Sequence, residues 1–244
     1  MTSFSILLVG LLLGMQHATE ADHLAAVATL ATRQSSLAQT LRQGVAWGVG
    51  HTLTLMAFGG AIFLLGQAIS PGLERALETA VGIMLIVLGA DVLRRLIRER
   101  IHFHAHRHDV QPEHVHAHGH RGEEGRHAES KHGHGHAKRW PLRALAVGMM
   151  HGLAGSAALV VLSLKAVPSL PLGLGYIAVF GVGSIAGMAL LSVVIALPLR
   201  LSAGYLVGLH RTMTALVGMF TCTLGAFVVM ENGFLQGLFP GLPR

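Results

Sequence analysis

The feature that most constrains this chain is the separation of its charged residues from its apolar ones. Only 12% of the 244 residues are charged, and most of these lie in short bands. The apolar runs between the bands exceed the length of about 18 residues that marks a transmembrane candidate. We therefore predict an all-α, polytopic membrane protein. Its six expected spans are residues 4–32, 44–69, 76–97, 141–165, 171–199 and 205–230.

The first of these spans is too long for a simple crossing. An unbroken helix over residues 4–32 would be about 43 Å long, whereas the hydrocarbon core of a bilayer is about 30 Å thick. Ionisable residues also lie in the middle of this run. We therefore expect a break or a re-entrant bend there, which a membrane tolerates where protein or water surrounds the backbone.

Lys and Arg residues predict the orientation. Most of them follow the first, third and fifth spans, and the other side holds only Arg75, Lys165 and Arg244. Because cytoplasmic loops carry the excess of positive charge, we expect both termini outside the cell and residues 99–140 in the cytoplasm. The expected location is the plasma (inner) membrane, in contact with lipid. Because the basic residues are divided among helix ends, a nucleic-acid partner is not favoured. The sequence does not indicate which oligomeric state the protein adopts.

The two halves of the chain resemble each other. Short Gly-containing motifs pair residues 14–17 with 148–151, 48–51 with 181–184, and 81–90 with 217–226. Each half has three predicted spans, so the second half would begin on the opposite side, which is the inverted repeat of many secondary transporters. A duplicated packing motif is the alternative, because glycines let helices approach closely. We predict repeats at 1–98 and 141–244, with a loop at 99–140.

Four ionisable residues lie within seven positions of the first span. Such residues are costly inside a membrane and usually mark function. Imidazole and carboxylate groups suit Ni²⁺, Co²⁺ and Zn²⁺, whereas Mg²⁺ and Ca²⁺ prefer oxygen ligands. The single cysteine, Cys222, excludes a thiolate cage. The first-choice ligands are His17, Asp22, His23 and His51, and His151 and Glu20 are further candidates.

Two points about these ligands stay open in the sequence. At about 100° per residue, His17, Asp22 and His23 cannot converge on one ion from a straight helix. Either the helix unwinds, or some of these residues bind the metal and others orient them. His151 is equally well explained as a packed residue beside Gly152.

Most of the 17 histidines lie in the loop between the third and fourth spans. Its His-x-His pattern, without apolar periodicity, predicts a disordered metal-binding tract. The alternative is a solvated linker that senses pH. The candidate metal-buffering residues are His102, His104, His106, His108, His114, His116, His118, His120, His127, His132, His134 and His136.

The motif His17-Ala-Thr-Glu-Ala-Asp22-His23 resembles the H-x4-D-H signature of the nickel/cobalt transporter family, and Gly50-His51-Thr52 resembles an element of that family's next helix. The chain is most similar to the shorter six-span branch, the NicO and urease-accessory UreH-like proteins. The resemblance implies Ni²⁺ or Co²⁺ transport, with His17, Asp22 and His23 in metal selection. The later acidic motifs of the larger members have no match in the fourth span.

A secondary permease for a divalent transition metal is therefore the first hypothesis. The ion is Ni²⁺ or Co²⁺, with Zn²⁺ as the third candidate, and no other cofactor is expected. No nucleotide-binding motif is present. The membrane potential slightly favours uptake, but proton antiport could reverse the direction, so efflux stays open. The chain is not expected to be an enzyme. The alternatives are a metal-sensing or storage protein and a membrane metalloenzyme, although the sequence lacks H-E-x-x-H.

Overall fold

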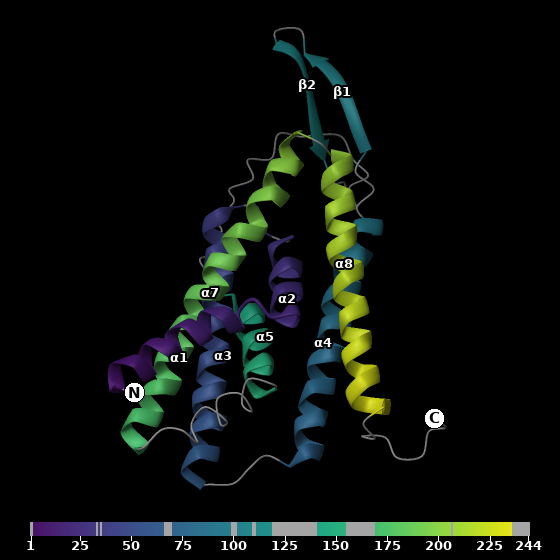
Figure 1. Cartoon of the computed structure of the whole chain (residues 1–244). Helices are drawn as coiled ribbons and strands as arrows, with labels where there is room; N and C mark the ends of the chain where they lie inside the picture. The colour runs from purple at the N-terminus through teal and green to yellow at the C-terminus, as the bar shows by residue number, and fades with distance from the viewer. Residues whose placement is uncertain are drawn as a thin grey trace.

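The computed structural model describes residues 2–32, 34, 36–65, 70–98, 102–108, 111–118, 141–154, 169–205 and 207–235. Outside one short hairpin, every regular element in these ranges is a helix (Figure 1). The first half contains α1 Ser3–His17, α2 Ala21–Ala31, α3 Leu37–Leu65 and α4 Pro71–Arg98. The second half contains α5 Leu142–Leu153, α7 Leu170–Tyr205, α8 Val207–Val229 and the π-helix η1 Met230–Leu235.

The chain is a polytopic, α-helical membrane protein. In the described residues, α3, α4, α7 and α8 are each long and apolar enough to cross a bilayer, and α1 and α2 together form a fifth candidate span. The helix α5 has 12 residues and is too short to count by itself. Because residues 155–168 of the predicted fourth span lie outside the described residues, the total of six spans stays a prediction.

The break expected in the first span is confirmed. The helices α1 and α2 meet at a bend of 58° across Ala18–Glu20. The backbone amides of Thr19 and Glu20 still bond to the carbonyls of Gln16 and His17, at 2.9 and 3.1 Å. Glu20 then takes an extended conformation, with φ −62° and ψ 150°, which starts α2 in a new direction.

The helices pack in two groups. The helix α3 lies against α7, with α1 on α7 and α5 on α3, while α4 and α8 form a separate antiparallel pair (Figure 1). The short helix α2 contacts both groups. This arrangement puts the break between α1 and α2 where the two helix groups meet.

Glycines let the helices of the first group approach closely. A Cβ at Gly14 of α1 would overlap the carbonyl of Phe180 on α7, and a Cβ at Gly148 of α5 would overlap the carbonyl of Trp47 on α3. These four positions match across the two halves of the sequence, as an inverted repeat would place them. The helices α4 and α8 also approach closely at glycines. A Cβ added at Gly82 would lie 2.9 Å from the carbonyl oxygen of Gly225.

Part of the histidine-rich loop forms a two-stranded hairpin, although we predicted disorder there. The strands β1 His102–His108 and β2 Gln111–His118 are antiparallel, with His104 opposite His116. The difference has a simple cause, because the His-x-His alternation has the period of two that an extended strand requires. The rest of the predicted loop, including residues 119–140, lies outside the described residues, and the proposed domain boundaries stay predictions.

Candidate metal centre

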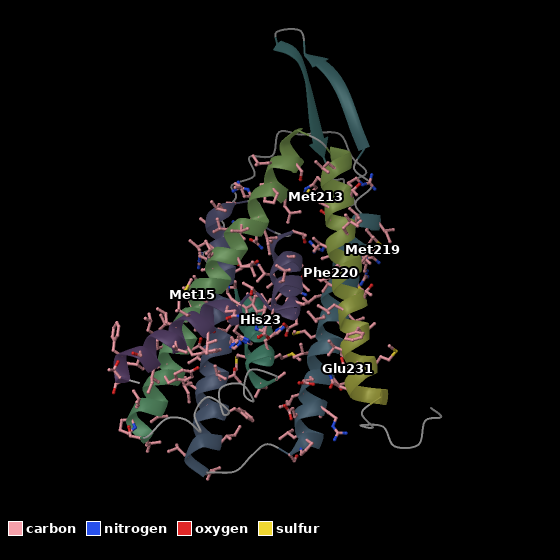
Figure 2. The ribbon with its side chains drawn as sticks, viewed as in Figure 1. Met15, His23, Met213, Met219, Phe220 and Glu231 are labelled. Carbon is pink, nitrogen blue, oxygen red and sulfur yellow. The ribbon has the colours of Figure 1, made fainter. Side chains whose placement is uncertain are left out.

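The break in the first span brings histidines from four helices together. His17 is the last residue of α1 and His23 lies in the first turn of α2, with their ring centroids 4.5 Å apart. His51 of α3 is 5.1 Å from the ring of His17 and 5.3 Å from that of His23. His151 of α5 lies 4.8 Å from His23. Figure 2 shows His23 in the interior, among α2, α3 and α5.

Two carboxylates orient the histidines of the broken span. The Nδ1 atom of His17 is 2.7 Å from Oε1 of Glu20, and Nδ1 of His23 is 2.8 Å from Oδ1 of Asp22. An ionised carboxylate only accepts hydrogen bonds, so each Nδ1 is the donor and each Nε2 keeps its lone pair. This carboxylate–histidine arrangement is the one that positions metal-ligating imidazoles in other proteins.

The other two histidines are oriented from their own surroundings. His151 places Nδ1 3.2 Å from the carbonyl oxygen of Val147, one turn earlier, so Nδ1 donates and Nε2 is available as a ligand. That Nε2 lies 3.7 Å from Oδ2 of Asp22. The Nε2 atoms of His51 and His17 are 3.1 Å apart, and because Nε2 of His17 keeps its lone pair, Nε2 of His51 is the donor.

Several of these buried nitrogens have no hydrogen-bond partner in the protein. Among the described residues, Nε2 of His23, Nδ1 of His51 and Nε2 of His151 are enclosed without a hydrogen bond. All four histidines are at most 4% exposed. Leaving one such polar atom unpaired costs about 1–3 kcal/mol, so three in one cluster indicate that a ligand belongs there.

The donor atoms form two sets that share one residue. His17, His23 and His51 have ligand atoms within 4.8 Å of one another, and so do Asp22, His23 and His151. Nitrogen donors with a single carboxylate suit borderline divalent ions such as Ni²⁺, Co²⁺ and Zn²⁺. Trp47 stacks on His23 at 5.7 Å and Phe180 lies 5.5 Å from His17, so aromatic side chains border the cluster.

A cavity of about 380 Å³ adjoins the cluster. On one side it is bordered by His17, Glu20, Asp22, His23 and His151. On the other side it is bordered by Glu78 of α4 and Asn232 of η1, together with apolar side chains of α4 and α8. The cavity therefore lies between the two helix groups and reaches the ligands.

The structure brings together all six residues that the sequence predicts for the membrane site. His151, which was equally well explained as a packed residue, is within 3.7 Å of Asp22. Glu20 contacts His17, which places it as an orienting group. The role of each as a metal ligand stays a prediction. Of the loop histidines, His120, His127, His132, His134 and His136 lie outside the described residues.

Glu78 is a residue that sequence reasoning missed. It is an ionisable residue in the predicted span 76–97, and that position was the available signal. Only the packing of α4 against α2 and η1 shows that it borders the same cavity as Asp22.

Comparison with known proteins adds one match over nearly the whole chain. The sequence is 34% identical over 237 residues to the urease accessory protein UreH of Bacillus sp. (strain TB-90), covering 96% of this chain and 95% of that protein. No family model matches the chain, and no solved structure matches it. The match spans both halves, so it includes every helix that contributes to the histidine cluster.

Proposed function

We infer a transport function from the premise that this chain belongs to the family of the urease accessory protein UreH, a branch of the nickel/cobalt transporter family. The proposed function is secondary transport of Ni²⁺ or Co²⁺ across the membrane. The ion is the substrate, and the histidine cluster with Asp22 is its binding site. A role connected with a metal follows from the family and the cluster together.

The observation that carries this proposal is the position of the cluster at a helix break. His17 ends α1 and His151 lies in the last turn of α5, so two helix C-termini are directed toward the cluster. The C-terminal end of a helix is negatively polarised and favours a cation. Broken helices with ion sites at their ends are a recurrent feature of secondary transporters.

The cavity gives the ion an approach from the proposed outer side of the membrane. Glu78 lies two turns after the start of α4 and Asn232 lies in η1, beyond the end of α8. These ends of the helices are opposite the hairpin, as Figure 2 shows for Glu231. The basic residues Arg94, Arg95 and Arg98 lie at the hairpin end of α4, which the positive-inside rule assigns to the cytoplasm. The cavity thus opens toward the proposed outer side.

The membrane potential adds a driving force in the same direction. Moving two positive charges inward is favoured by about 4.6 kcal/mol per 100 mV. With the cavity on the outer side, an ion would enter past Glu78 and reach Asp22 and His151 before the fully enclosed His51. A transporter of this kind needs no nucleotide.

The test is metal flux into liposomes that hold the purified protein. Under an inside-negative potential, we expect saturable uptake of Ni²⁺ or Co²⁺, with Zn²⁺ as the comparison ion. The variant Asp22→Asn should lower the uptake rate by at least about tenfold. Metal binding without flux, under an imposed potential and under a pH gradient, would exclude the permease.

A second candidate function is metal storage, and the hairpin register favours it. His102, His104 and His106 lie opposite His118, His116 and His114, respectively. Three histidine pairs in succession would give loosely chelating positions outside the membrane. Deleting residues 102–136 separates the two candidates, because a transporter should keep most of its flux, whereas a store should lose its metal capacity.

A further inference from the structure

We propose that the transported ion occupies two successive positions that share His23. The outer position is formed by Asp22, His23 and His151, and the inner position by His17, His23 and His51. This inference rests on the proposed transport function. It adds a route, in which the ion changes two of its ligands while His23 stays bound.

The two positions differ in their access to the cavity. All three members of the outer set border it, and Asp22 is the only group of the two sets that is more than slightly exposed. The inner set has His17 and His23 at the cavity. His51 is 0% exposed and is not among the residues that line the cavity. An ion arriving through the cavity would therefore find the outer set complete there, whereas the inner set also needs His51, which lies away from the cavity.

The spacing of the donors favours two positions over one larger site. First-row ions hold nitrogen and oxygen ligands at about 2.0–2.2 Å, so the donors of one ion lie within about 4.4 Å of one another. Within the described residues, each set of three meets a limit of 4.8 Å, and the sets have only His23 in common. Small side-chain movements would complete either set.

The orienting contacts keep the two sets distinct. Glu20 holds the ring of His17, which belongs to the inner set alone. Val147 accepts the bond from Nδ1 of His151, which belongs to the outer set alone. Asp22 touches both histidines of the outer set, with Oδ1 on His23 and Oδ2 toward His151. Each set thus has its own orienting group, and His23 links them.

The shared ligand prevents double occupancy. Two dications bound to one imidazole would repel strongly at such short range. The membrane cluster therefore holds one ion at a time, and the ion divides its time between the two positions. This predicts a simple rule for affinity: the association constant of the wild type equals the sum of the constants of the two positions.

The rule is tested by Co²⁺ binding to the full chain in detergent. His51→Gln leaves the outer position, His151→Gln leaves the inner one, and His23→Gln removes both. Binding is measured by equilibrium dialysis and by the visible absorption of bound Co²⁺. The signal of His23→Gln is subtracted, so that the contribution of the histidine-rich loop cancels. Size-exclusion chromatography checks that each variant is folded.

We expect the association constants of His51→Gln and His151→Gln to add up to that of the wild type, so the stronger of the two stays within twofold of it. The two variants should give different Co²⁺ spectra, whose weighted sum reproduces the wild-type spectrum. The double variant should fall to the level of His23→Gln. Where a Gln variant does not fold, Ala at the same position replaces it.

Two results would overturn the proposal. The first is a loss of more than tenfold in both single variants, which is the behaviour of one site that needs all its ligands. The second is two Co²⁺ ions per wild-type chain above the His23→Gln level. Flux is measured separately, so a chain that binds Co²⁺ by the additive rule but moves none would reject the transport function and leave the two positions standing.

Discussion

In the first half of the chain, Gly14 brings α1 against the α7 backbone at Phe180. In the second half, Gly148 brings α5 against the α3 backbone at Trp47. The contacts match residue for residue, and each short helix ends at the histidine cluster. Packing is therefore shared between the halves, as expected when glycine spacing decides how closely helices approach.

The chemistry of the two halves differs. The first half supplies His17, Asp22, His23 and His51 to the cluster, and the second half supplies His151. At the position that matches His51, the second half has Ser184, whose Oγ donates to the carbonyl oxygen of Gly14 in α1. The two halves therefore share their helix packing, whereas most of the candidate ligands between them come from the first half.

The largest expected effect is on the ligand that both proposed positions share. His23→Ala should lower Ni²⁺ or Co²⁺ uptake into liposomes by at least about 100-fold, because it removes a donor from each set. His210→Ala is the matched control. It lies near the start of α8, where its Nδ1 is 3.0 Å from the carbonyl oxygen of Leu199, and it belongs to neither donor set. Equal loss in both variants would contradict a site at His23.

Substitution of a glycine at a helix contact tests the packing that the two halves share. Gly14→Ala and Gly148→Ala each place a methyl group against a backbone carbonyl. Each should lower the free energy of unfolding by about 1–3 kcal/mol, the usual cost of overpacking, and the two losses should be similar. Thermal unfolding in detergent measures both.

The control for this pair is Gly60→Ala in α3, where the added methyl group meets nothing within 4 Å. That variant should be neutral or more stable by up to about 1 kcal/mol, because Ala favours a helix over Gly. A large difference between Gly14→Ala and Gly148→Ala would show that the halves do not pack equivalently.

A smaller effect is expected at the cavity, where the second helix group contributes a carboxylate. Glu78→Gln should raise the KM for uptake about fivefold, equivalent to about 1 kcal/mol, with little change in maximal rate, because a negative charge on the approach concentrates cations. High ionic strength should reduce the difference. Glu74→Gln, one turn earlier and away from the cavity lining, should change KM less. A change confined to maximal rate would place Glu78 outside the approach.

The sequence predicts the helices of this fold better than it predicts which helices contact one another. Long apolar runs and an excess of length in the first span were sufficient to predict the helices and the break at Ala18–Glu20. The ionisable residues of that span predicted the cluster because they are costly in a bilayer. These are local properties, which a single sequence carries directly.

What the sequence does not carry is contact between distant helices. Whether His151 packs or joins the cluster depends on how α5 lies against α3, and Glu78 borders the cavity only because α4 meets α2. The hairpin was missed for a different reason. Its apolar residues are few, Phe103 and Ala105 in β1 and Val115 and Ala117 in β2, and we interpreted the alternating histidines as a loop although their period is that of a strand.

The smallest expected effect is on stability, at Ser184, the position in the second half that matches His51. Ser184 donates from Oγ to the carbonyl oxygen of Gly14 at 3.2 Å, so it ties α7 to α1 just before the break. Ser184→Ala should lower the free energy of unfolding by about 0.5–1 kcal/mol, the net value of one hydrogen bond. Ser192→Ala is the control, because its Oγ donates to the carbonyl oxygen of Met188 within the same helix. If Ser184→Ala leaves stability unchanged but alters metal affinity, this position takes part in binding, and the division between a ligand half and a packing half is wrong.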